Sequence, residues 1–170
     1  MAPVHLSDPR FDEIVNRISE SYPNSCVIYI EEVQNPVLEE AYQLRKAEIQ
    51  KTRGHVQEMQ LFHGTHENNI KSISESGFDP TLNVRAAFGY GVYFARDAKY
   101  SSNYMVTKSR ENYCFMFLCD VLVGKTGTRR PKGDTSVDNN VDHANPTIIT
   151  TVYPDGAYPR YIIAFYKSVS

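Results

Sequence analysis

The second half of the chain is dominated by apolar segments, most of which follow one another through loops too short for helical crossovers. Four of these segments are rich in β-branched and aromatic residues and are typical of strands: GVYFA (91–95), NYCFMFLCDVLVG (112–124), TIITTVY (147–153) and RYIIAFY (160–166). Parallel neighbours need a long crossover, usually a helix, whereas antiparallel strands can be joined by short turns. We therefore predict an α+β fold with a largely antiparallel sheet.

The first half of the chain supplies the longer helices and a further strand. Ser7 is the expected N-cap of a first helix, because its hydroxyl can accept a bond from a free N–H of the first turn. The apolar residues of that helix share one face: Phe11, Ile14, Val15 and Ile18. SCVIYIEEV (25–33) predicts a strand, and NPVLEEAYQLRKAEIQKTR (35–53) predicts a helix capped by Asn35. Shorter helices are predicted over 67–77, ended by Gly77, and over 98–105, capped by Asp97.

A histidine stands near the end of a predicted strand in the middle of the chain. QEMQLFHG (57–64) alternates so that His63 points to the same side as Met59 and Leu61. A single histidine in such a place is more often a core residue satisfied by the main chain than a ligand. Further motifs are needed to decide between the two.

Length and charge limit the classes of function. The 170 residues, 41% of them apolar and 12% aromatic, can bury one independent core, so we expect a single domain over 1–170. The formal charge of -2 and the pI near 6.2 give no reason to expect strong binding to nucleic acid. Arg129, Arg130 and Lys132 form a local basic cluster, which a solvated loop explains equally well. No apolar run approaches the ~20 residues of a membrane span and no signal peptide is visible, which indicates an intracellular protein without a membrane partner.

Cysteine and histidine spacing gives little support for a metal site. The cysteines are odd in number, form no C-x-x-C pair and lie in apolar runs typical of core residues. They are Cys26, Cys114 and Cys119. His63 and His66 have the i, i+3 spacing that would bring two imidazoles to one metal on a helix, but the Gly-Thr between them is typical of a turn. We therefore expect no metal.

Common nucleotide-binding and hydrolase motifs are absent from the sequence. FGYGVYF contains G-x-G, but Phe94 occupies the position of the third glycine and the segment is a strand, which excludes a Rossmann fingerprint. The chain has no P-loop, no G-x-S-x-G and no H-E-x-x-H.

Three spaced segments carry a family resemblance: LFHGT (61–65), GYGVYFA (89–95) and YSSNY (100–104). With IEEVQNPVLEEAYQLRK before them and YPRYIIAFY after them, they resemble, in order, the catalytic domain of the poly(ADP-ribose) polymerase family, the diphtheria-toxin-like ADP-ribosyltransferases. The resemblance covers about residues 25–167. It implies the ADP-ribosyltransferase fold, a largely antiparallel split β-sheet core flanked by short helices, with NAD as co-substrate.

The resemblance also implies roles for individual residues. The Gly64 main chain would hold the nicotinamide carboxamide, helped by the Ser101 hydroxyl, while Tyr104 would stack on the ring and Tyr93 would flank its other side. His63 would bond the adenosine ribose. The remaining cofactor-binding positions are Thr65, Asn69 and Phe94. Each residue taken alone has a structural explanation, but their joint order favours a site.

The third motif position departs from the polymerising members, which carry a glutamate there. Counting back from YPRYIIAFY places Ile148 at that position, and no acidic residue lies in 146–154. The chain is thus similar to the His-Tyr-Ile subgroup, with His63, Tyr93 and Ile148 as its catalytic set. That similarity implies transfer of single ADP-ribose units to an Asp or Glu of a protein acceptor, automodification included. The alternative left open is a catalytically silent module that binds NAD, ADP-ribose or a partner.

Two regulatory features follow from the same resemblance. The segment 78–90 corresponds to the donor loop, in which Phe88 or Tyr90 would cover the NAD ribose. The stretch before residue 25 is too short for a helical autoinhibitory subdomain, so none is expected in this piece.

Overall fold

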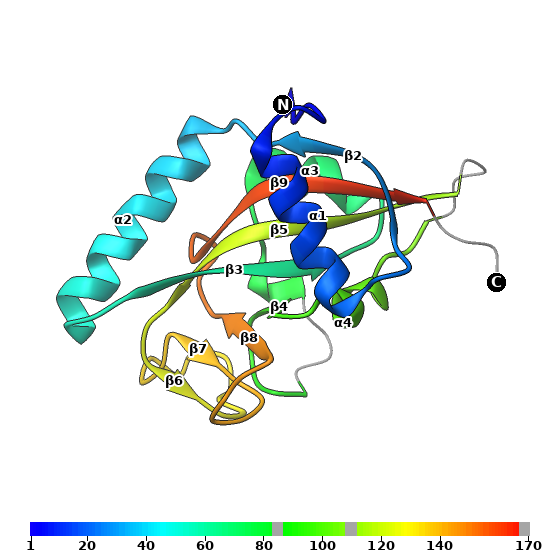
Figure 1. Cartoon of the computed structure of the whole chain (residues 1–170). Coiled ribbons are helices and arrows are strands. Elements are labelled where there is room, and N and C mark those ends of the chain that lie inside the picture. The colour runs from blue at the N-terminus through cyan, green and yellow to red at the C-terminus, as the bar shows by residue number, and fades with distance from the viewer. Residues whose placement is uncertain (83–86, 108–111, 167–170) are drawn as a thin grey trace.

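The computed structural model describes residues 1–82, 87–107 and 112–166. Its centre is a seven-stranded sheet, with a separate two-stranded pair at one end (Figure 1). The main sheet contains β1 (Ala2–Pro3), β2 (Cys26–Glu32), β3 (Gln57–Gly64), β4 (Val92–Ala95), β5 (Tyr113–Val123), β8 (Ile148–Thr151) and β9 (Ala157–Tyr166). The two-stranded pair is β6 (Thr126–Gly127) with β7 (Asn139–Asn140). The helices are α1 (Pro9–Ser21), α2 (Pro36–Arg53), α3 (Asn69–Ser76) and α4 (Ala98–Ser102), and a 3-10 turn, η1, covers Pro80–Leu82.

The strand order confirms the prediction of an antiparallel α+β fold. The main sheet has the order β1-β2-β9-β5-β3-β4-β8, and all of its neighbours run antiparallel. The ladder between β3 and β5 runs the full length of β3, whereas β3 and β4 share a single pair, Phe62 with Ala95. The sheet is therefore split between β3 and β4.

Both faces of the sheet carry apolar cores. Because side chains alternate along β3, Leu61 joins the core beneath α2 and α3, while Phe62 joins the core beneath α1 and α4. In Figure 1, α1 crosses in front of the central strands. The predicted apolar face of α1 is confirmed, with Phe11, Ile14 and Ile18 buried and Val15 partly buried. Within the described ranges, no helix combines the length and the apolar character needed to cross a membrane.

The helix caps are partly as predicted. Asn35 caps α2 through its side chain, as the sequence indicates. The first helix is capped by Asp8 and not by Ser7, since the Asp8 carboxylate accepts a bond from a first-turn N–H. Asp97 precedes α4 but makes no side-chain capping bond, and α4 ends at Ser102, three residues earlier than predicted.

One cysteine lies where the sequence does not predict it. Cys114 and Cys119 are buried in β5, but Cys26 is exposed at the start of β2. The outer edge of β2 pairs with β1 only opposite Glu31 and Glu32. Near Cys26, β2 therefore pairs only with β9. The apolar run of β2 does not make this end of the strand part of the core.

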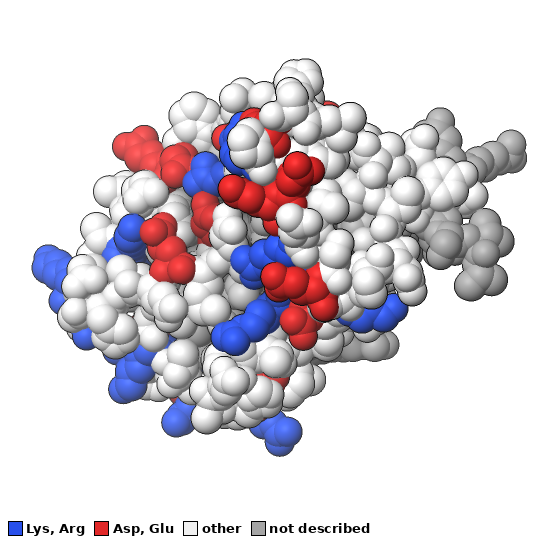
Figure 2. Space-filling model, in the orientation of Figure 1, with Lys and Arg blue, Asp and Glu red and all other residues white. Residues whose placement is uncertain are grey.

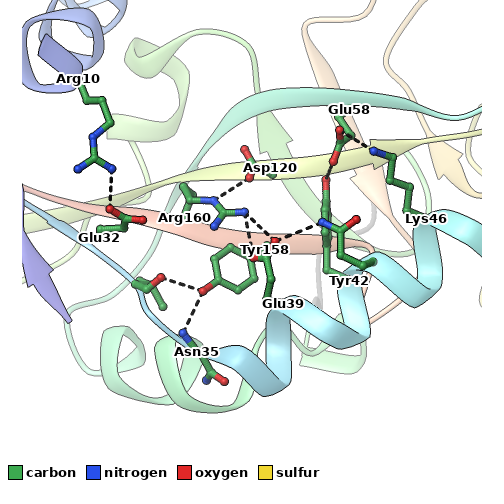
Figure 3. Close-up of polar contacts among 12 residues, drawn as sticks. Arg10, Glu32, Asn35, Glu39, Tyr42, Lys46, Glu58, Asp120, Tyr158 and Arg160 are labelled. Atoms are coloured by element: carbon green, nitrogen blue, oxygen red, sulfur yellow. Dashed lines mark hydrogen bonds and ion pairs between the residues drawn. The ribbon is translucent and has the colours of Figure 1, made fainter.

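Arg160 of β9 connects α2 to the sheet (Figure 3). Its guanidinium donates to Asp120 of β5 at 2.8 Å and pairs with Glu39 of α2 at 3.0 Å. The guanidinium also lies over the Tyr158 ring, 4.2 Å from the centroid. The fully buried residues of α2 are Tyr42 and Ile49. This ion network is one of the polar attachments of α2, which also include the pairs Arg45–Asp155 and Arg53–Asp138.

Candidate active site

A cavity of about 580 Å³ opens where β3 ends beside β4. Its other walls come from α3, α4 and the segment that leads from Gly77 into η1. Eight of the predicted site residues line it: His63, Gly64, Thr65, Asn69, Tyr93, Phe94, Ser101 and Tyr104. The fold thus brings together the eight positions that the resemblance gives as cofactor-binding, in a cavity of the size typical for small-molecule ligands.

The His63 side chain is fixed by β4 and by two phenylalanines. Its Nδ1 lies 2.8 Å from the main-chain oxygen of Tyr93, and because a carbonyl can only accept, Nδ1 carries the hydrogen. The ring packs against Phe78 and Phe94, with centroids 5.0 and 5.4 Å away. This burial lowers the pKa of His63, so the imidazole is neutral at pH 7 and Nε2 remains as an acceptor.

Gly64 is required by the packing of α4 against β3. A Cβ at this position would collide with the main-chain oxygen of Ser101 and crowd the Cβ of Tyr104. Any side chain would therefore push α4 away from the strand. Ser101 is 3% exposed, and its hydroxyl makes no hydrogen bond to the described residues. That hydroxyl is thus a polar group at the cavity wall that is available to a ligand.

Tyr93 organises the loop that leads into β4. Its hydroxyl accepts a bond from the Phe88 N–H and donates to the Gly89 carbonyl, both at 2.8 Å. Burial raises the pKa of Tyr93, so the hydroxyl keeps its hydrogen for the bond to Gly89. The sequence suggests a role for the ring of Tyr93, and the structure adds this use of the hydroxyl.

Two tyrosines in and just after α4 form a pair at the cavity wall. The hydroxyl oxygens of Tyr100 and Tyr104 are 3.1 Å apart, and the ring centroids are separated by 5.5 Å. Tyr104 is 52% exposed, which leaves ring surface open for stacking. Burial, together with the bond to Tyr104, raises the pKa of Tyr100. Sequence reasoning missed Tyr100, although the i, i+4 spacing in YSSNY would place both rings on one side of a helix.

The remaining predicted residues differ in how directly they face the cavity. Asn69 Nδ2 donates to Thr65 Oγ1 at 3.0 Å, which joins an exposed amide to a buried hydroxyl. Phe94 is 1% exposed and packs on His63. Phe94 therefore supports the imidazole more than it offers surface to a ligand.

Ile148 is not among the described residues that line the cavity. It begins β8 opposite Ala95, two positions from the pair that Tyr93 forms with Thr150. Directly opposed residues of antiparallel strands point to the same face, so Ile148 and Tyr93 share one face of the sheet. The Ile148 side chain is buried, and its N–H donates to Asp142 Oδ1 at 3.2 Å.

The donor loop meets the cavity through residues other than the expected ones. The described lining residues of this segment are Phe78, Asp79, Leu82 and Ala87. Phe88 and Tyr90 do not line the cavity; Phe88 is held by Tyr93, and the Tyr90 N–H donates to the Arg130 carbonyl at 2.9 Å. Residues 83–86 of the loop lie outside the described residues.

Ionisable groups are few around the cavity. Of the described lining residues, Asp79 alone carries a carboxylate. Its Oδ1 accepts from the Thr81 hydroxyl at 2.6 Å and from the Thr81 N–H at 2.9 Å, and these bonds lower the pKa of Asp79. His66 Nδ1 accepts from the Asn68 N–H at 3.1 Å. Across the ranges that the structure describes, no three His, Cys, Asp or Glu side chains gather as a metal ion would require.

Comparison with known proteins gives the family of this fold and site. The family model described as the poly(ADP-ribose) polymerase catalytic domain matches residues 10–156. The chain therefore belongs to this family, and its split antiparallel sheet is the ADP-ribosyltransferase fold. The resemblance read from the sequence is confirmed.

Several relatives carry the name protein mono-ADP-ribosyltransferase. PARP12 of Mus musculus is 34% identical over 177 residues, which cover 95% of this chain and 25% of the relative. PARP11 of Homo sapiens is 29% identical over 98% of this chain and 59% of the relative. PARP14 of Homo sapiens is 28% identical over 95% of this chain and 10% of the relative. The chain thus spans less than two thirds of the length of each of these relatives.

Proposed function

We propose that this chain is an NAD-dependent mono-ADP-ribosyltransferase domain, which moves one ADP-ribose from NAD to a protein acceptor and releases nicotinamide. The observation that carries the proposal is the single cavity in which His63, Gly64, Tyr93, Ser101 and Tyr104 meet. Family membership and the names of the relatives support the same activity.

Nicotinamide binds between Tyr93 and Tyr104 in this proposal. Tyr104 has open ring surface, and offset stacking on an aromatic ring suits a flat cationic heterocycle. The Ser101 hydroxyl and the main chain of Gly64 can match the oxygen and the NH₂ of the carboxamide. Tyr93 closes the opposite side, with its hydroxyl already engaged by the donor loop.

His63 faces the adenosine ribose in this arrangement. Its neutral Nε2 can accept a hydrogen bond from a ribose hydroxyl, because Nδ1 is occupied by the Tyr93 carbonyl. Thr65 and Asn69, which are bonded to each other, supply further polar atoms on the same stretch of wall.

Electron pairs and charges balance in this reaction when the acceptor is a carboxylate. The bond between ribose C1′ and the pyridinium nitrogen breaks, its electron pair stays on nicotinamide, and positive charge develops at the ribose. An Asp or Glu carboxylate of the acceptor then forms a bond to C1′. One positive and one negative charge are cancelled and no proton moves, so a strong base is not needed. This suits a cavity whose one carboxylate among the described lining residues, Asp79, is bonded to Thr81.

Single transfer follows from the residue at the start of β8. Chain growth requires attack by a ribose hydroxyl, which is a weak nucleophile unless a base activates it. Ile148 stands where the polymerising relatives have glutamate, and 146–154 contains no acidic residue. After one transfer the acceptor carboxylate is esterified and cannot react again.

Incubation of the protein with adenylate-labelled NAD, followed by gel electrophoresis and nicotinamide measurement, tests the proposal. A sharp labelled band that hydroxylamine removes supports single transfer to a carboxylate, whereas a smear indicates polymer. Nicotinamide release without protein labelling indicates hydrolysis. Calorimetric binding of NAD with neither label nor nicotinamide release indicates a silent binding module and overturns the proposal.

A matched pair of variants makes the test specific to the cavity. Tyr104→Ala removes the proposed stacking ring and should abolish most of the labelling. Tyr166→Ala is the control, because Tyr166 is 49% exposed, also packs on a second tyrosine and does not line the cavity. Equal loss of labelling in both variants would contradict a stacking role for Tyr104.

A further inference from the structure

A strongly basic span lies on the lobe that contains β6 and β7. Residues 125–132, KTGTRRPK, include no acidic residue, and their four cations are all exposed: Lys125, Arg129, Arg130 and Lys132. We call these four residues the basic patch. Without them, 14 of the 18 cations remain in the chain against 20 acidic residues. Figure 2 shows Lys and Arg side chains along the lower edge of the molecule, and Figure 1 places β6 and β7 in this lower part of the view.

The basic patch has two acidic neighbours, Asp134 and Asp79, but few close ion pairs. Arg130 has a distant ion pair, with Nη1 3.8 Å from Asp134. Among the described residues, the other three members form no ion pair. Asp138, the nearby buried carboxylate of the lobe, is already paired with Arg53 at 3.0 Å. The patch therefore presents positive charge to an approaching partner.

The basic patch adjoins the cavity on two sides. The Arg129 N–H donates to the Phe88 carbonyl at 2.9 Å, and Phe88 directly follows Ala87, which lines the cavity. Lys132 lies near Asp79, another lining residue. Its positive charge adds to the lowering of the Asp79 pKa by the bonds from Thr81. The patch members themselves do not line the cavity, and their link to it is the main-chain bond to Phe88.

A buried amide holds the patch in this place. Asn140 is fully buried; its Oδ1 accepts from the Arg130 N–H at 2.9 Å, and its Nδ2 donates to the Tyr90 carbonyl at 3.0 Å. Gly89 packs against the same amide, where a Cβ would come within 2.5 Å of it. The patch and the donor loop are thus joined through a satisfied core amide, which fixes their relative position.

We propose that the basic patch docks a carboxylate-rich segment of the protein acceptor and presents one of its carboxylates to the cavity. This inference rests on the proposed function, in which an acceptor carboxylate attacks ribose C1′. An acidic segment is repelled by the net negative remainder of the chain and attracted to this span, which is bonded to the loop that contains the lining residue Ala87. The patch thereby selects acidic acceptors, because its charge raises their rate of association and their affinity. It also orients the bound segment relative to the cavity.

Peptide binding in the absence of NAD tests the inference independently of catalysis. The probe is a fluorescent glutamate-rich peptide, and its glutamine counterpart is the uncharged comparison, with anisotropy measured at low and high salt. The patch variant is Arg129→Gln/Lys132→Gln. The control variant, Lys46→Gln/Lys51→Gln, removes two cations of α2, none of whose residues lines the cavity, and therefore the same charge.

We expect the glutamate-rich peptide to bind wild type and the control equally, and the patch variant about five- to tenfold more weakly, as two exposed charge contacts allow. The difference should shrink at high salt. ADP-ribosylation of the same peptide should show a raised KM for peptide in the patch variant, with the KM for NAD unchanged.

Several outcomes overturn the inference. Equal peptide affinity in the patch and control variants would do so, as would a raised KM for NAD with unchanged peptide affinity, which would assign the patch to the dinucleotide. Binding of a single-stranded RNA oligonucleotide but not of the peptide would assign it to nucleic acid. Peptide binding that depends on the patch, in a protein that never consumes NAD, would contradict the proposed function and leave the docking surface intact.

Discussion

The imidazole of His63 donates from Nδ1 to the main-chain oxygen of Tyr93, 2.8 Å away across the split of the sheet. The bond connects the end of β3 to β4 where the ladder between them has a single pair. It also selects the tautomer that leaves Nε2 for a ligand. One hydrogen bond therefore serves both the closure of the sheet and the preparation of the cavity.

The first prediction concerns acid stability. Burial lowers the pKa of His63 in the folded state, so below about pH 6.5 the unfolded chain binds a proton that the folded chain resists. The free energy of unfolding should fall as the pH is lowered through this range and be insensitive to His63 above it. Urea unfolding at a series of pH values should show a weaker acid dependence for His63→Asn than for wild type. His55→Asn, at an exposed histidine, is the control; identical acid profiles for wild type and His63→Asn would contradict the prediction.

The second prediction concerns the hydroxyl of Tyr93. In Tyr93→Phe the ring remains, but the Phe88 N–H and the Gly89 carbonyl lose their partner. We expect a loss of about 1–2 kcal/mol in unfolding free energy and a several-fold rise in the KM for NAD, with kcat less affected. Hydrogen exchange should accelerate at residues 88–90. Tyr90→Phe is the control, since the Tyr90 hydroxyl bonds none of the described residues; the same changes there would show that any hydroxyl of this loop has the effect.

Much of the fold and the site can be predicted because local patterns encode them. Alternation along QEMQLFHG predicts the side on which His63 lies, and the structure confirms it, since Leu61 and the rings around His63 belong to the same core. The order of the family motifs predicts eight of the described residues that line the cavity. These are properties of adjacent residues or of a fixed motif, which a single sequence records directly.

Other features depend on contacts between distant residues and could not be predicted. Phe78 packs on His63 from a segment without periodicity. The need for glycine at 64 comes from the carbonyl of Ser101, 37 positions later, and not from a turn. Ser7 and Asp8 are both good capping residues, and the choice between them depends on where the chain enters the helix.

The third prediction follows from the close approach of α4 to β3. Gly64→Ala places a methyl group against the main-chain oxygen of Ser101, which cannot rotate away. We expect α4 to shift, with a loss of about 1–3 kcal/mol in unfolding free energy and a fall in NAD affinity that exceeds the effect of Ser101→Ala. Calorimetry with NAD and thermal unfolding measure the two quantities. A Gly64→Ala protein with wild-type affinity would show that the strand and helix can separate freely.

The fourth prediction concerns the attachment of α2. Arg160→Met keeps much of the side-chain volume but leaves Asp120 and Glu39 without their shared cation. These groups are partly buried, so we expect a loss of about 1–3 kcal/mol in unfolding free energy. Lys46→Met is the control, because it breaks the more exposed pair with Glu58 and should cost less than about 1 kcal/mol. Urea unfolding compares them, and equal losses would contradict the assigned importance of Arg160.

The last prediction concerns Ile148, the residue that the sequence resemblance places at the glutamate position of the polymerising family members. Ile148 is 4% exposed, so Ile148→Glu buries a carboxylate among apolar neighbours, which raises the pKa of the new group. We expect a loss of about 2–4 kcal/mol in unfolding free energy near neutral pH, with part of it recovered in acid, where the folded state binds the proton more readily than the unfolded chain. Ile148→Gln, which is polar and uncharged, should lack this recovery, and Ile148→Val should cost only about 0.5–1.5 kcal/mol.

Labelled NAD should still give a sharp band with Ile148→Glu, because elongation also requires that the hydroxyl of a bound ADP-ribose be held against C1′. A smear of polymer would show instead that the missing carboxylate alone limits this protein to a single transfer.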